Sequence, residues 1–224
     1  MTFRHFLALE VASLVASSSA PARPAVLGVV EEADRVHLNN GAVSPGATVY
    51  DGDRFSTERG GMLLLRGDAA MLELGEEGEV VVRRSPNGAQ GTAAELDKGT
   101  LVFTAARAVA VEVVSLEARV RPGAGSRTVG QVSVTAPKEL FICARRGVLQ
   151  FSYGGETETI AEGAAYRVIL NPAEDGLGKT KPVKAARHRN PFLFVALTGG
   201  AAAATSVILY ENHRHKRMES PDRP

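Results

Sequence analysis

The sequence has little cysteine, few aromatic residues and little net charge, and each shortage excludes a class of site. Cys143 is the only cysteine in 224 residues, so the chain forms no internal disulfide and no cysteine-based metal site. Aromatic residues make up 5% and tryptophan is absent, which argues against a stacking platform for single-stranded nucleic acid or sugar. The formal net charge is +1, so no overall charge attracts a polyanion. We therefore expect no nucleic-acid partner.

Long amphipathic helical patterns are also missing between residues 25 and 170. Turn signals rich in glycine, asparagine and proline recur there about every eight to twelve residues, as at 39–41 and 154–155. Between the turns, segments such as 131–136 (QVSVTA) and 148–153 (VLQFSY) place apolar residues at every second position. This alternation is typical of strands with one buried and one solvent-facing side. It predicts an all-β domain over 25–170, built as a sandwich, barrel or solenoid of many short strands.

Near the C-terminus the chain has one long run without charge. Residues 191–210 read PFLFVALTGGAAAATSVILY, and a helix over 192–210 would cover roughly 28 Å, close to the hydrocarbon thickness of a bilayer. We predict a single transmembrane helix at 191–210, with a buried core helix as the alternative. The side chains predicted to lie in the membrane are Phe192, Leu193, Phe194, Val195, Leu197, Val207, Ile208, Leu209 and Tyr210. The basic side chains predicted to flank it are Lys184, Arg187, Arg189, Arg214, Lys216 and Arg217.

The first 24 residues have features of a signal peptide. Arg4 and His5 precede an apolar stretch that Glu10 interrupts, and 20–22 (APA) offers a cleavage site. We predict a signal peptide at 1–24, with a short amphipathic or disordered leader as the alternative. Export would place the β-domain in the periplasm and the basic tail, 211–224, in the cytoplasm. Without export, the domain would be cytoplasmic and tail-anchored. The chain has five Lys and Arg residues before the run and four after it, so the charge distribution does not decide between these two orientations.

Residues 173–180 (AEDGLGKT) carry the letters of a phosphate-binding loop. Such a loop needs a parallel strand before it and a helix after it. Here the strand-like residues 166–170 close an antiparallel-looking series, and Glu174 and Asp175 place negative charge where phosphates would bind. We therefore interpret 171–190 as a linker between the β-domain and the membrane, and reject a nucleotide hydrolase.

The remaining chemically active side chains are interpreted as structural. Glu73, Glu76, Glu77 and Glu79 lack the alternating oxygen ligands of a calcium loop, so they predict a solvated turn. Cys143 lies in an apolar strand-like run and is predicted to be buried and inert.

Two other groups of charged residues receive the same interpretation. The arginine pairs 83–84 and 145–146 are predicted to be exposed strand-end charges, although a joint basic patch stays open. His213 and His215 are assigned to the basic tail because a metal site needs further ligands. We predict no catalytic, metal-binding or cofactor-binding residues, and no cofactor.

Several glycine turns and strands follow one another in a particular order. Residues 49–57 (VYDGDRFST) lead to a strand at 62–65, then to 96–103 (LDKGTLVF), to 132–151 and to a closing pair at 156–168. This order resembles the FecR domain, an extracytoplasmic all-β domain of bacteria. The late segment departs from the family, which often has Gly-Thr where this chain has Gly147-Val148. The best-known members carry a cytoplasmic N-terminal segment that contacts a sigma factor, and because no sizeable one precedes this domain, we do not carry that role over.

The resemblance implies an envelope domain that binds or scaffolds another molecule. Together with the uncharged run, it predicts a non-enzymatic protein that crosses the bacterial inner membrane once and binds an envelope protein or glycan. The alternative is a transmembrane signalling regulator of a sigma-factor pathway, whose tail at 211–224 reports occupancy of the domain. No small-molecule substrate is evident from the sequence.

Overall fold

The computed structural model describes residues 25–86, 91–125, 127–171, 192–197 and 206–207, and every regular element in them is a strand. The strands are β1 (Val26–Leu38), β2 (Gly41–Ala42), β3 (Thr48–Tyr50), β4 (Asp53–Arg66), β5 (Ala70–Leu74), β6 (Glu79–Arg84), β7 (Thr92–Ala105), β8 (Val111–Ser115), β9 (Ala118–Pro122), β10 (Thr128–Ala136), β11 (Glu139–Arg146), β12 (Leu149–Tyr153), β13 (Glu156–Ile160), β14 (Ala165–Leu170), β15 (Phe192–Ala196) and β16 (Ser206–Val207). They form one sheet, so the all-β prediction is confirmed. Within the described residues there is no helix with the length and apolarity to cross a bilayer.

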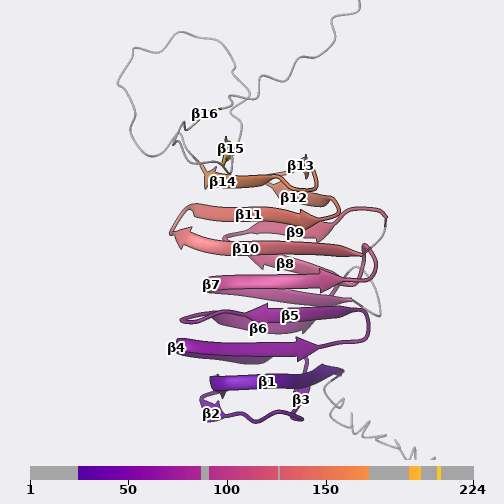
Figure 1. Cartoon of the computed structure of the whole chain (residues 1–224), viewed down its shortest axis with the longest axis vertical. Helices are drawn as coiled ribbons and strands as arrows, with labels where there is room; N and C mark the ends of the chain where they lie inside the picture. The colour runs from indigo at the N-terminus through magenta and orange to yellow at the C-terminus, as the bar shows by residue number, and fades with distance from the viewer. Residues whose placement is uncertain (1–24, 87–90, 126, 172–191, 198–205, 208–224) are drawn as a thin grey trace, which may run out of the picture.

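The sheet folds back on itself into two layers that rise along one axis (Figure 1). The front layer contains, in order, residues 26–34 of β1, 62–66 of β4, β5, 99–105 of β7, β10, β11, β14 and β15. The back layer contains residues 53–57 of β4, β6, 92–98 of β7, β8, β9, β12 and β13. Neighbouring strands are antiparallel throughout the described residues, except for β7 and β8.

Three long strands pass from one layer to the other, and each bends at a residue with positive φ. These residues are Arg35 in β1 (51°), Gly60 in β4 (66°) and Gly99 in β7 (85°). Glycine adopts this left-handed conformation without steric cost. At Gly99 space is also short, because an added Cβ would lie 2.5 Å from the Cα of Gly78. The glycine-rich turns read from the sequence thus include corners at which a single strand changes layer.

The core lies between the two layers and follows the alternation predicted from the sequence. Leu149, Phe151 and Tyr153 of β12 point inward, and the first two are 0% exposed. Phe103 of β7 is also 0% exposed, and its ring packs against Gly130 of β10, where an added Cβ would lie 2.4 Å from the ring. Burial of one side of each strand holds the layers together through the hydrophobic effect.

The C-terminal run begins as a strand in the described residues. Residues 192–196 form β15, which pairs antiparallel with β14, whereas the sequence predicts the start of a helix there. The strand forms because Phe192 and Phe194 alternate onto the inner side, where both rings meet Phe151 edge-to-face at centroid distances of 5.0 and 5.3 Å. Val195 lies in the same strand and is 5% exposed.

The rest of the predicted membrane run is only partly described. Leu197 follows β15, and Val207 belongs to β16, which pairs with β15. The following predicted segments and residues lie outside the described residues: the leader 1–24, residues 172–190 of the linker with the phosphate-loop-like segment, the basic tail 211–224, Lys184, Arg187, Arg189, Ile208, Leu209, Tyr210, Arg214, Lys216 and Arg217. The transmembrane helix at 191–210 as a whole therefore stays a prediction.

Candidate interaction surface

The two layers present outer faces of different chemistry, and the back face is rich in paired charges. Arg83 of β6 pairs with Glu95 of β7, with 3.0 Å between nitrogen and oxygen. Arg54 of β4 pairs with Asp97 at 3.0 Å and also with Glu79. These side chains point away from the core because their neighbours along each strand point inward. Such mutually neutralised charges suit a face in contact with water.

A buried carboxylate completes the charge pairing on the back face. The side chain of Glu112 in β8 is only 4% exposed and lies under Arg119 and Arg121 of β9, at 3.3 and 2.8 Å. The hairpin of β8 and β9 brings them together, since Val113 is paired with Val120. Two guanidinium groups offset the cost of burying this carboxylate. The arrangement stabilises the hairpin and leaves Glu112 in a structural role.

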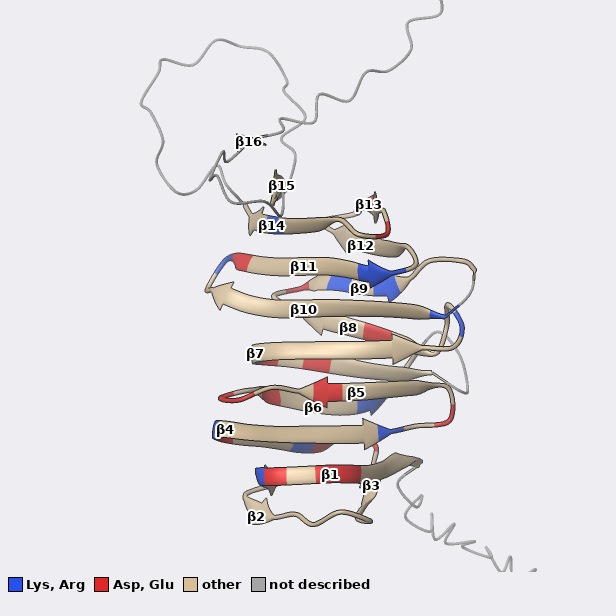
Figure 2. Cartoon of the chain, in the orientation of Figure 1, with Lys and Arg blue, Asp and Glu red and all other residues tan. Residues whose placement is uncertain are grey.

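The front face, in contrast, carries a broad band without charge. Its members point outward from five strands that are neighbours in the sheet. All are half-buried except Ser133, which is buried. They are Met62, Leu64, Met71, Thr100, Val102, Thr104, Val129, Gln131, Ser133, Phe141 and Cys143. Figure 2 shows this face as largely tan, with acidic residues on β1 and β5 and basic residues at the end of β11.

Strand register places the members of the band in rows across the sheet. One row runs through Leu64, Glu73, Val102, Gln131 and Cys143, one residue from each of β4, β5, β7, β10 and β11. Side chains in such a row lie side by side at the spacing of neighbouring strands, about 4.8 Å. Glu73 interrupts this row between Leu64 and Val102, and the uncharged part of the row runs without a break from Val102 to Cys143.

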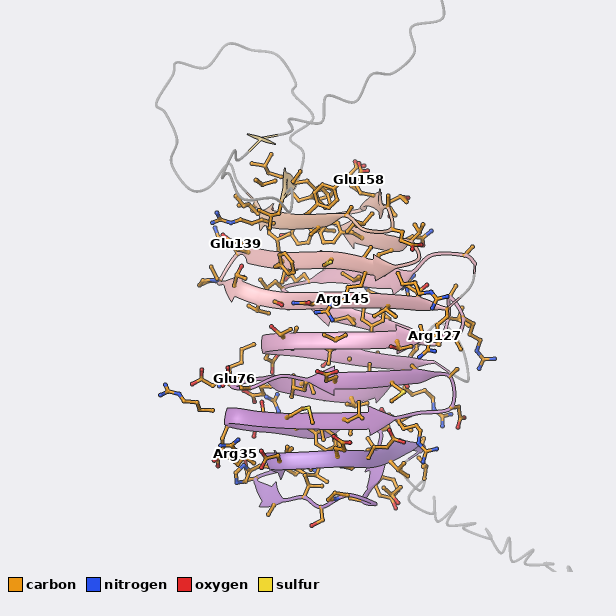
Figure 3. All side chains as sticks on the ribbon, in the orientation of Figure 1. Arg35, Glu76, Arg127, Glu139, Arg145 and Glu158 are labelled. Carbon is orange, nitrogen blue, oxygen red and sulfur yellow. The ribbon has the colours of Figure 1, made fainter. Side chains whose placement is uncertain are left out.

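Two charged side chains border the centre of this band. Glu73 has no ion pair with any described residue, and Arg145 donates a hydrogen bond to the side-chain oxygen of Gln131. Figure 3 shows Arg145 on the front layer near β10. The two charges have opposite signs and lie on opposite sides of the central strands β7 and β10.

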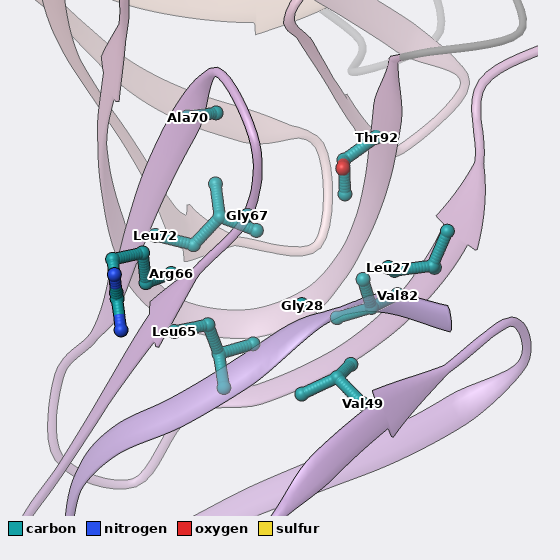
Figure 4. A pocket seen from close by; sticks show the side chains of 10 residues that line it. All are labelled: Leu27, Gly28, Val49, Leu65, Arg66, Gly67, Ala70, Leu72, Val82 and Thr92. Atoms are coloured by element: carbon teal, nitrogen blue, oxygen red, sulfur yellow. The ribbon is translucent and has the colours of Figure 1, made fainter. Parts of the chain in front are cut away.

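Two hollows between the described residues are too small for an organic ligand. One, lined by Gly28, Leu65 and Gly67 among others, encloses about 10 Å³ (Figure 4). Another, beside Asp68 and Arg84, encloses about 40 Å³. Ligand pockets usually enclose roughly 300–1,000 Å³, whereas these volumes suit one or a few waters.

The free edge of the back layer is protected by carboxylates. Within the described residues, β13 pairs only with β12, and its Glu156 and Glu158 take the inward phase opposite Tyr153 and Phe151. Burial raises the pKa of the Glu158 carboxyl, and the charge of Glu156 raises it further. Figure 3 places Glu158 at the end of the stack. Inward-facing charge of this kind discourages a further strand from pairing with an edge.

The structure separates the acidic residues that the sequence grouped together. Glu76 and Glu77 lie in the β5–β6 turn, and Glu76 accepts a hydrogen bond from the Gly60 amide at 2.7 Å, which confirms the turn. Glu73 and Glu79, however, lie in strands and face opposite sides of the molecule.

The arginine pairs also belong to different layers. Arg83 and Arg84 end β6 in the back layer, whereas Arg145 and Arg146 end β11 in the front layer. They form no common patch, and the prediction of exposed strand-end charges is confirmed. His213 and His215 lie outside the described residues.

Cys143 corrects one prediction from the sequence. It lies in a strand as expected, but it is half-buried on the front face, not in the core. Its neighbours Ile142 and Ala144 take the inward phase and are 0% exposed. The apolar run FICA does not show which of its side chains point inward, because cysteine fits either side of a strand.

No protein-family model and no curated protein matches this chain. The resemblance to the FecR domain therefore stays a prediction from the order of turns and strands in the sequence.

Proposed function

We propose that this chain is a membrane-anchored, non-enzymatic envelope protein of FecR-like type, and that it binds another protein through the front face of its β-domain. The contrast between the two outer faces supports this proposal most directly. The centres of protein interfaces are depleted in charged residues, and around Val102 the band carries a single charged neighbour in register, Glu73. The back face instead carries ion pairs across its middle, such as Arg83 with Glu95, as a face in water does.

A protein fits this face better than a glycan or a small molecule. The band is an open sheet surface, and the two hollows of about 10 and 40 Å³ are lined by residues outside it. Phe141 is the one aromatic ring in the band, so the face has few groups on which sugar rings could stack. A flat, uncharged surface is instead suited to burial against a second, complementary surface.

Site-specific photocrosslinking tests the docking surface. A photoreactive amino acid replaces Val102 on the front face or, as a matched control, Val114 on the back face; both valines are half-buried and face outward in mid-strand. We expect a protein adduct in intact cells from position 102 and none from position 114. Equal adducts from both positions, or none from 102, would contradict the proposal.

Membrane anchoring by a helix over 191–210 requires residues 192–196 to leave their pairing with β14, and it has its own test. A charge at the centre of a transmembrane helix costs about 2.5–3.5 kcal/mol, so Ala202→Arg is expected to release the chain from membranes in alkaline carbonate, whereas Ala202→Leu is not. Retention of the arginine variant in the membrane pellet, or release of the wild type, would remove the anchor from the proposal.

A further inference from the structure

We propose that the protein bound by the front face is a second copy of this chain, packed face to face. The stack of strands, meaning their succession along the long axis of the molecule, runs in the opposite direction in the second copy. This inference rests on the proposed function, because it names the partner of the same face. The argument comes from the positions of two opposite charges relative to the middle of the sheet.

The midline of the front layer lies between β7 and β10. Glu73 lies on β5, one strand beyond β7, and Arg145 lies on β11, one strand beyond β10. Both lie in the same region along the strands. Glu73 is in register with Val102, and Val102 pairs with Gln131. Arg145 donates a hydrogen bond to the side chain of that glutamine. The face therefore carries a negative and a positive group at equal numbers of strands from its centre.

Face-to-face packing by a two-fold axis has two simple orientations on such a sheet. An axis parallel to the strands, above the midline, places β5 of one copy over β11 of the other, so that Glu73 faces Arg145 of the second copy. The symmetry repeats every contact, so this ion pair forms twice. An axis parallel to the stack would instead place each strand over itself and bring like charges together. The charges therefore select the antiparallel dimer.

The groups between the two ion pairs fit this arrangement. Val102 and Gln131 lie on the two central strands, so in the dimer β7 of each copy covers β10 of the other. The Thr100 hydroxyl already donates a hydrogen bond to the Ser133 hydroxyl within one copy at 2.9 Å, so this donor has a partner before the faces meet. Two sheets packed in this way lie about 10 Å apart, with their side chains interleaved.

Other surfaces offer less to a second copy. The outward charges of the back face, such as Arg83 with Glu95, are already neutralised within one chain. The β13 edge carries inward carboxylates. Glu73 also opposes docking of the front face on an anionic lipid surface, since it would approach the negative headgroups.

The experiment measures the mass of the full chain in detergent micelles by sedimentation, over a range of protein concentrations. The wild type is expected to have twice the 23.6 kDa mass of one chain. Glu73→Arg and Arg145→Glu each turn two attractive contacts into repulsive ones, so each is expected to weaken dimerisation at least about tenfold. The double variant restores opposite charges and is expected to recover most of the wild-type affinity.

Two valine variants separate the front face from the membrane run as the source of dimers. Val102→Lys places a charge in the middle of the proposed interface and is expected to give monomers, whereas Val114→Lys on the back face keeps the dimer. Circular dichroism and thermal midpoints establish that each variant is folded.

The possible outcomes distinguish this inference from the proposed function. A monomeric wild type, a dimer insensitive to Val102→Lys, or failure of the charge-swapped double variant to recover would overturn the dimer. If the photocrosslink at 102 then joins the chain to a different protein, the docking function stands and only the second copy is excluded. If position 102 yields no adduct and the chain is monomeric, both proposals fall.

Discussion

Replacing Phe194 by alanine tests whether β15 belongs to the domain core in the intact chain. In the structure, the Phe194 ring meets Phe151, Tyr166 and Phe192 edge-to-face, with centroids 5.3, 5.2 and 5.1 Å away. A transmembrane helix over the same residues would instead take Phe194 away from Phe151. The two arrangements therefore predict different effects on the stability of the β-domain.

The size of the expected effect follows from burial and ring contacts. Truncating a fully buried phenylalanine to alanine costs roughly 3–5 kcal/mol. Phe194 is half-buried in β15, so we expect its removal to lower the free energy of unfolding by about 2 kcal/mol. Each edge-to-face contact contributes about 0.5–1.5 kcal/mol beyond burial, and a double-mutant cycle with Phe151→Ala is expected to recover a coupling energy of that size.

The assay is urea unfolding of the full chain in neutral detergent, followed by far-ultraviolet circular dichroism because the chain has no tryptophan. Leu193→Ala is the matched control: it lies on the same strand, faces outward and is expected to cost less than about 1 kcal/mol. A loss below about 0.5 kcal/mol for Phe194→Ala, with no coupling to Phe151, would refute the packing of β15 on the core.

Two further predictions concern the body of the domain. Gly130→Ala forces a methyl group to within 2.4 Å of the buried Phe103 ring and is expected to destabilise the fold by about 1–3 kcal/mol, whereas Gly41→Ala, whose nearest neighbour would be 3.5 Å away, is expected to be tolerated in the same urea assay. Hydrogen bonding to the Arg167 guanidinium lowers the pKa of the Glu139 carboxyl, so this pair stabilises the fold above the ordinary carboxyl pKa and the contribution is lost as the pH falls through the lowered value. Arg167→Gln is therefore expected to be less stable than wild type at about pH 7 but equal to it at about pH 2, and a stability difference that persists unchanged at low pH would contradict this assignment.

The strands and turns of the domain could largely be predicted from the sequence. Alternation in 148–153 identified the strand, and the structure gives its inward side as Leu149, Phe151 and Tyr153. The asparagine-rich turn at 39–41 and the paired glycines at 154–155 were also predicted, and Asn39, Asn40 and both glycines have positive φ. These features are local, because period-two alternation and left-handed backbone depend on a few neighbouring residues.

The front face could not be predicted in the same way. Glu73, Val102, Gln131 and Cys143 are widely separated in the chain, and only strand register places them in one row. The sequence grouped Glu73 with the turn that follows it and assigned Cys143 to the core. A shift of one residue in register or phase moves a side chain to the other face, and no local pattern fixes this choice.

By itself, then, the sequence determined that this is an all-β chain of short alternating strands, with an uncharged run near its end. The tertiary structure decided which outward residues meet, and so gave a back face with several ion pairs and a front face with a largely uncharged band. It also decided that residues 192–196 pair with β14, where the exposed edge and the Phe151 ring offer hydrogen bonds and apolar contact. The reason is the same in both cases: the partners are distant in sequence, and only folding brings them within contact distance.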